Sequence, residues 1–83
     1  MTVHAIRLKP GDDLRGSLDR LAREWELEAA CVVTCVGSLT EASLRMAGAA
    51  TERHVDGPFE IVSLTGTLSR HGSHCHIALS DGE

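Results

Sequence analysis

The part of the sequence that most limits the fold is one amphipathic segment, residues 14–25. Its apolar residues recur at helical spacing on one face, while most of the charged residues between them fall elsewhere. That face consists of Leu14, Leu18, Leu21, Ala22 and Trp25. Asp12 and Asp13, just before the segment, can each cap the first turn, so we predict a helix that starts there. A helix with one apolar face must lie on something flat.

Most of the remaining chain has the patterns of β-strands. Alternating or continuous apolar runs predict strands at residues 3–8, 29–36, 42–47, 58–69 and 74–80. The run at 29–36 is almost wholly apolar and rich in β-branched residues, so we expect it to be the central strand, buried on both faces. Residues 48–57, which contain His54, predict a loop, and residues 70–73 predict the turn of a hairpin.

The order of these segments predicts an α+β fold in which one amphipathic helix packs on a mostly antiparallel sheet. The 83 residues fit a single domain, 1–83, with a thin core. The composition, 42% hydrophobic and 24% charged, is that of a globular protein. Because no apolar run has the length of a membrane span or the form of a signal peptide, we expect a cytoplasmic protein with no membrane partner. The three cysteines lack a CxxC spacing and predict reduced, mostly buried thiols.

The charge balance argues against nucleic acid as a direct partner. Twelve acidic residues outnumber eight basic ones, for a net charge of -4, whereas a protein that neutralises phosphates carries a basic surplus on one face. The sequence also lacks the Arg-Gly-Arg core of an AT-hook. We therefore expect direct DNA binding to be weak or absent.

Four blocks of sequence, in this order, resemble the plants and prokaryotes conserved (PPC) domain. They are LKPGDDL at 8–14, VGSL at 36–39, GPFEIVSLTG at 57–66 and HCHIALSD at 74–81. The resemblance covers nearly the whole chain. The family includes plant nuclear proteins in which the domain accompanies AT-hooks, and stand-alone prokaryotic proteins named as DNA-binding.

The resemblance implies a compact α+β fold, a homotrimer and a role in protein contacts. The plant members use a Gly-Arg-Phe-Glu-Ile-Leu segment for such contacts, and Gly57, Phe59, Glu60 and Ile61 match it as partner-binding residues. Pro58 replaces its arginine, so a contact that needs that charge does not carry over. Family members continue into a Gly-Gly-His segment and a last strand, so we expect a domain truncated at its C-terminus relative to the family.

His74 and His76 are the sharpest chemical signal in the chain. Two positions apart on a strand, their imidazoles share a face and can approach one metal ion, such as zinc. A third donor would have to come from His4, His54, His71 or another subunit. The alternative is that both are surface or interface side chains.

The other candidates are weaker. Glu60 is either a solvated strand carboxylate or an interface residue, and Cys75 alternates away from its two histidine neighbours into the core. Ser38 has the place of a turn residue, so no residue is assigned a catalytic role.

The sequence thus favours an oligomeric binding or scaffold module over an enzyme, with any DNA contact indirect. The alternative function is a small metal-dependent enzyme or small-molecule binder, with a subunit-boundary site around His74 and His76.

Overall fold

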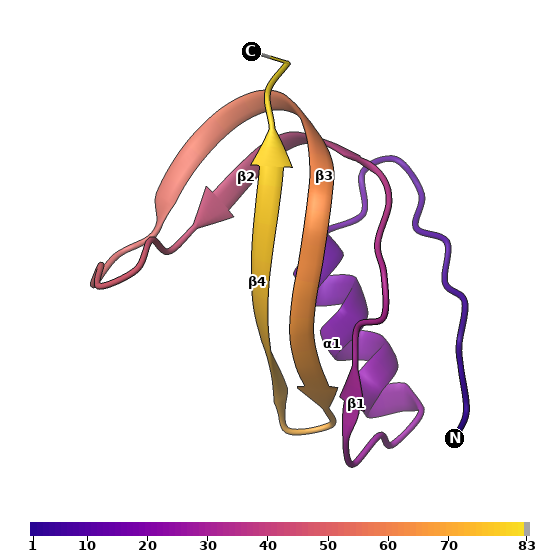
Figure 1. Cartoon of the computed structure of the whole chain (residues 1–83). Helices are drawn as coiled ribbons and strands as arrows, with labels where there is room; N and C mark the ends of the chain where they lie inside the picture. The colour runs from indigo at the N-terminus through magenta and orange to yellow at the C-terminus, as the bar shows by residue number, and fades with distance from the viewer. Residues whose placement is uncertain (83) are drawn as a thin grey trace. The chain divides into compact units, whose positions relative to one another are not determined.

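The fold was analysed in a computed structural model that describes residues 1–82. The elements follow in the order α1 (Leu14–Glu24), β1 (Ala30–Cys31), β2 (Ser38–Leu44), β3 (Arg53–Ser69) and β4 (Gly72–Ser80). The four strands form one sheet in which β1 and β2 each pair antiparallel with β3, and β4 also pairs with β3 (Figure 1). This confirms an α+β fold with one helix and a mostly antiparallel sheet. The predicted end of the domain at Glu83 lies outside the described residues.

The chain divides into two units. One comprises residues Met1–Cys31 and Gly66–His74, and the other comprises Val32–Thr65 and the end of the chain from Cys75. The long strands β3 and β4 contribute residues to both units.

The first unit contains the helix, which forms where its pattern predicted. The Asp13 carboxylate accepts a hydrogen bond of 2.7 Å from the backbone N–H of Gly16 and so caps the helix, as expected of this position. Ala22, on the apolar face, is buried, and Leu14, Leu18 and Leu21 are half-buried. Trp25 instead caps the C-terminus and stacks on the ring of His4 at 4.5 Å between centroids.

Three predicted strands differ from the structure. In place of the strand expected at 42–47, β2 begins earlier, at Ser38, and ends at Leu44. The segment at 3–8 forms no strand among the described residues, because no strand of the sheet pairs with it, and Val3 is 75% exposed. Of the predicted central strand at 29–36, only β1 is formed, opposite Leu68 and Thr67. Val36, which we expected to be buried, is 92% exposed. The central strand is β3, because it is the strand with which the other three pair.

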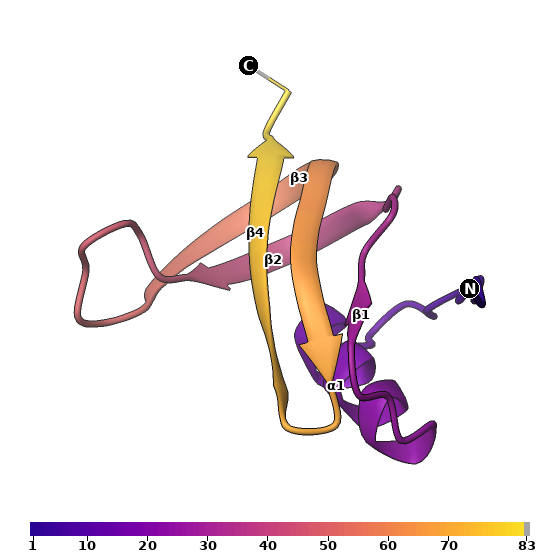
Figure 2. The same cartoon turned by 60° about the horizontal axis from the view of Figure 1, so that its bottom comes forward.

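The second unit contains the β2–β3 ladder, which Figure 2 shows as two strands joined by a wide connection. β3 begins at Arg53, so the prediction of a loop over residues 48–57 is wrong for its last five residues, His54 included. The physical reason is that polar residues at 54 and 56 alternate with less exposed residues at 55 and 57, which is strand periodicity with the polar face in solvent. Ala42 and Leu64 are the buried hydrophobic residues of this unit.

The predicted hairpin is confirmed. β3 covers the expected strand at 58–69, Arg70 and His71 form the turn, and β4 covers the expected strand at 74–80. Gly72 starts β4 with φ of 137°, in the region that favours glycine.

Candidate functional site

The two predicted metal ligands lie on β4 with the expected alternation. His74 and His76 are exposed, whereas Cys75, Ile77 and Leu79 are less exposed, so the two imidazoles share the outer face of the strand. Among residues 1–82, no group of three His, Cys, Asp or Glu donors that could surround one ion includes either histidine. Within one copy of the described chain, the pair therefore has two of the three or four donors that a zinc site needs.

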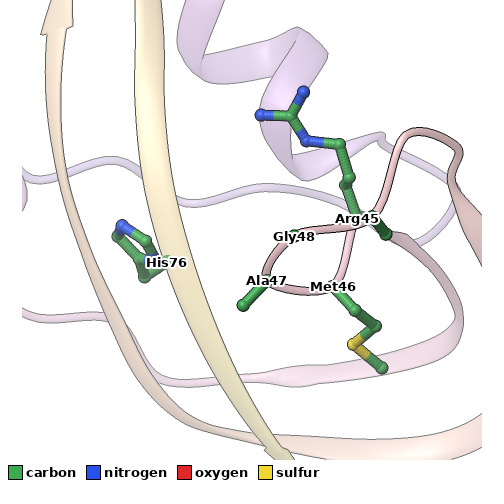
Figure 3. Close-up of a pocket in the computed structure, with 6 residues that line it drawn as sticks. Arg45, Met46, Ala47, Gly48 and His76 are labelled. Atoms are coloured by element: carbon green, nitrogen blue, oxygen red, sulfur yellow. The ribbon is translucent and has the colours of Figure 1, made fainter.

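Next to His76 lies a surface pocket of about 440 Å³. The turn after β2 forms most of it, since Arg45, Met46, Ala47, Gly48 and Ala49 are its other lining residues. Figure 3 shows the side chains of Arg45 and Met46 leaving the turn in opposite directions, while the small Ala47 points toward the strand that carries His76. The guanidinium and the imidazole therefore do not converge on one point, and the pocket has a single imidazole in its lining.

The predicted partner-binding segment begins at an irregularity of the β2–β3 ladder. Leu39 pairs with Phe59 and Glu41 with Asp56, so one residue of β2 faces two residues of β3, Gly57 and Pro58, between these pairs. The ladder therefore has a β-bulge at the start of the segment.

Close backbone approach explains the glycine at this bulge. A Cβ on Gly57 would lie 2.8 Å from the carbonyl oxygen of Thr40 and 3.0 Å from that of Leu39. Both are backbone atoms that cannot rotate away, so only glycine fits without a shift of the strands. Gly57 thus has a structural role, whatever its role in partner contacts.

The other residues of the segment divide between the two faces of β3. Phe59 and Ile61 are half-buried, whereas Glu60 is exposed. Pro58, Phe59 and Glu60 also line a hollow of about 420 Å³, together with Ser38 and the residues at the end of β4 and just after it (80–82). The predicted partner-binding residues are therefore continuous with a concave surface.

A third group of residues was not anticipated as a unit. Glu41 of β2 and His54 and Asp56 of β3 offer ligand atoms that all lie within 4.8 Å of one another. The Nε2 atom of His54 lies 3.0 Å from Oδ1 of Asp56 and 3.9 Å from Oε2 of Glu41. On the other side of the ring, Nδ1 lies 3.2 Å from the hydroxyl oxygen of Ser43, within hydrogen-bonding distance.

Only one residue of this group was a candidate metal ligand from the sequence alone. His54 had been considered as a third donor, but in a loop, and neither carboxylate was singled out. The His-Val-Asp spacing at 54–56 is the signal that strand alternation could have supplied. Pairing with Glu41 depends on the register of β2, which no local pattern specifies.

Comparison with known proteins settles the family. The family model of the Plants and Prokaryotes Conserved (PCC) domain, called the PPC domain above, matches residues 1–83. The chain belongs to this family. The expectation drawn from the four sequence blocks is thereby confirmed for this PCC domain.

Relatives agree with this assignment. Two curated proteins named "Bifunctional protein GlmU", from Synechococcus strains JA-3-3Ab and JA-2-3B'a(2-13), are 39% and 38% identical over 83 and 81 residues. The PCC domain spans 13% of the length of each. A solved structure of a hypothetical protein from Salmonella enterica is 40% identical, with a TM-score of 0.91 over 95% of this chain and 57% of that chain.

Within the described residues, no helix is long and apolar enough to cross a membrane.

Proposed function

We propose that this PCC domain is a self-associating binding module that contacts proteins. The observation that supports the proposal is how few hydrophobic side chains of the domain are buried. Among the described residues, the buried hydrophobic side chains are those of Ala22, Ala42 and Leu64, and no large side chain is fully buried. Eight large hydrophobic residues are exposed instead: Met1, Val3, Ile6, Trp25, Val33, Val36, Met46 and Val62. Association with further copies would remove such side chains from water.

The clearest candidate surface for a protein contact lies on strand β3. Val62, 64% exposed, is the last residue of the segment that resembles the partner-contacting segment of the family, where it replaces the family's leucine. Glu60 lies two positions earlier, also exposed, and lines the hollow described above. An exposed apolar residue with polar residues near it is the usual composition of a protein contact. We infer that residues 57–62 contribute to such a contact, with a homotrimer as the assembly.

Sedimentation equilibrium tests the proposal directly. At tens of micromolar, we expect a mass of three chains. A monomer of 8.9 kDa at that concentration would contradict self-association.

DNA contact, in this proposal, is indirect. The net charge of -4 repels the phosphate backbone, and three of the eight basic residues, Arg15, Arg20 and Arg70, are paired with carboxylates. Recruitment to DNA would therefore pass through another protein or another part of an assembly.

A second candidate function is metal or small-molecule binding at His74 and His76. The specific observation in its favour is that both imidazoles occupy the exposed face of β4, one of them beside a pocket. A neighbouring subunit in the assembly could supply the missing donor. Neutral imidazoles suit zinc, nickel and copper better than calcium or magnesium.

A further inference from the structure

We propose that Glu41, His54 and Asp56 form a binding site for one divalent transition metal ion of the zinc class, with water completing its coordination. The site lies on the exposed face of the β2–β3 ladder. It is separate from the His74 and His76 pair and does not depend on self-association.

The register of the β2–β3 ladder brings these residues together. Glu41 is directly opposite Asp56, and Ser43 is directly opposite His54, so four polar side chains form a square on one face. The bulge is what aligns them. Leu39 and Phe59, paired on one side of the bulge, are half-buried, whereas Glu41 and Asp56, the next pair, are exposed. The bulge thus turns Glu41 to the face on which Asp56 already lies.

The electrostatics of this square favour a cation. Two carboxylates directly opposite each other on a ladder are a destabilising arrangement unless positive charge lies between them. Among the described residues, the group that forms ion pairs with Glu41 and Asp56 is His54 alone, and no Lys or Arg pairs with either carboxylate. A divalent ion would neutralise both carboxylates at once.

The donor set and its spacing fit a zinc-class ion. Zinc takes imidazole nitrogen and carboxylate oxygen at about 2.0 to 2.2 Å, which places the donors of a tetrahedral site roughly 3.4 Å apart. The observed separations of 3.0 and 3.9 Å from Nε2 to the two carboxylate oxygens lie on either side of that value. The side chains are 52 to 86% exposed, so small rotations can close the difference.

The second ring nitrogen of His54 is also suitably placed. Metal-binding histidines usually donate their other N–H to a nearby acceptor, which orients the ring. The Ser43 hydroxyl oxygen, 3.2 Å from Nδ1, can accept this hydrogen bond and leave the Nε2 lone pair toward the carboxylates. Imidazole with carboxylates distinguishes the site from the oxygen-only sites that calcium prefers.

The test is a zinc titration of the full chain, followed by residue-resolved NMR of backbone amides and histidine rings. We expect saturable changes at the His54 ring and along 41–43 and 54–56. Glu41→Gln, which keeps the side-chain shape, should weaken this binding by about tenfold or more. The matched control is Glu24→Gln, which removes one exposed carboxylate from α1 outside the site and should leave the affinity within about twofold.

Three results would overturn the proposal. They are no change at His54 up to millimolar zinc, an equal loss of affinity in both variants, or changes confined to His74 and His76. A His74→Ala plus His76→Ala variant separates the two sites, because it should keep the His54 signal while losing any signal at β4. Circular dichroism of every variant checks that the sheet is intact.

Discussion

The geometry of the bulge at Gly57 decides whether an alanine there would stabilise or destabilise the protein. Glycine to alanine at a strand position with ordinary φ usually stabilises a protein by about 0.4 to 1 kcal/mol, because it restricts the unfolded chain. At Gly57, however, the added Cβ would meet the Thr40 carbonyl oxygen at 2.8 Å, the Phe59 nitrogen at 2.9 Å and the Leu39 carbonyl oxygen at 3.0 Å. These distances are several tenths of an ångström too short.

The steric cost should exceed the entropic gain. Relief requires β2 and β3 to move apart where they are hydrogen-bonded, and such overpacking costs about 1 to 3 kcal/mol. We therefore expect Gly57→Ala to lower the free energy of unfolding by about 1 to 2 kcal/mol, which for a domain of this size lowers the Tm by roughly 5 to 15 °C.

Gly37→Ala is the matched control. It lies in the same unit, and its added Cβ would meet only Cδ1 of Ile61 at 3.8 Å, an ordinary contact. This variant should be as stable as the parent or slightly more stable. The assay is urea unfolding followed by circular dichroism, with all proteins at one concentration because association shifts apparent stability. A Gly57→Ala protein as stable as the Gly37→Ala protein would refute the reasoning.

Three further predictions follow from the same structure. Leu64→Ala truncates the buried leucine of the second unit and should lower the free energy of unfolding by about 2 to 5 kcal/mol, measured by chemical denaturation. A loss below about 1 kcal/mol would show that Leu64 is not a core residue. Fluorescence anisotropy with an A·T-rich duplex at physiological salt should give a Kd no tighter than about 10⁻⁶ M, and tighter binding would contradict indirect DNA contact. In calorimetry at pH 7.5, the His74→Ala plus His76→Ala variant should bind fewer zinc ions per chain than the parent. Zinc binding by the parent should weaken on acidification, because a protonated imidazole cannot ligate. An unchanged stoichiometry in the variant would show that the two histidines are ordinary strand residues.

Local pattern was sufficient for some elements of the fold and not for others. The helix was predictable because both its capping carboxylate at Asp13 and its apolar spacing are local signals. The β3–β4 hairpin was predictable for a similar reason, with turn residues between two alternating runs. The segment at 29–36 was not, because an apolar, β-branched run has the same composition whether or not another strand pairs with it.

The candidate sites divide in the same way. The shared face of His74 and His76 follows from strand alternation and needs no knowledge of the fold. The group of Glu41, His54 and Asp56 depends on a cross-strand register that includes a bulge, and the loop predicted at 48–57 concealed it. That register follows from backbone contacts between β2 and β3, such as the close approach at Gly57.

Self-association through the exposed apolar side chains is the central claim, and sedimentation equilibrium of the parent beside two variants tests it. Val62→Asp places a charge on an exposed apolar position of β3, while Thr51→Asp places one on an exposed polar position before that strand. We expect trimers for the parent and for Thr51→Asp, with Val62→Asp shifted toward the 8.9 kDa monomer. A parent chain that is monomeric at tens of micromolar would contradict the account.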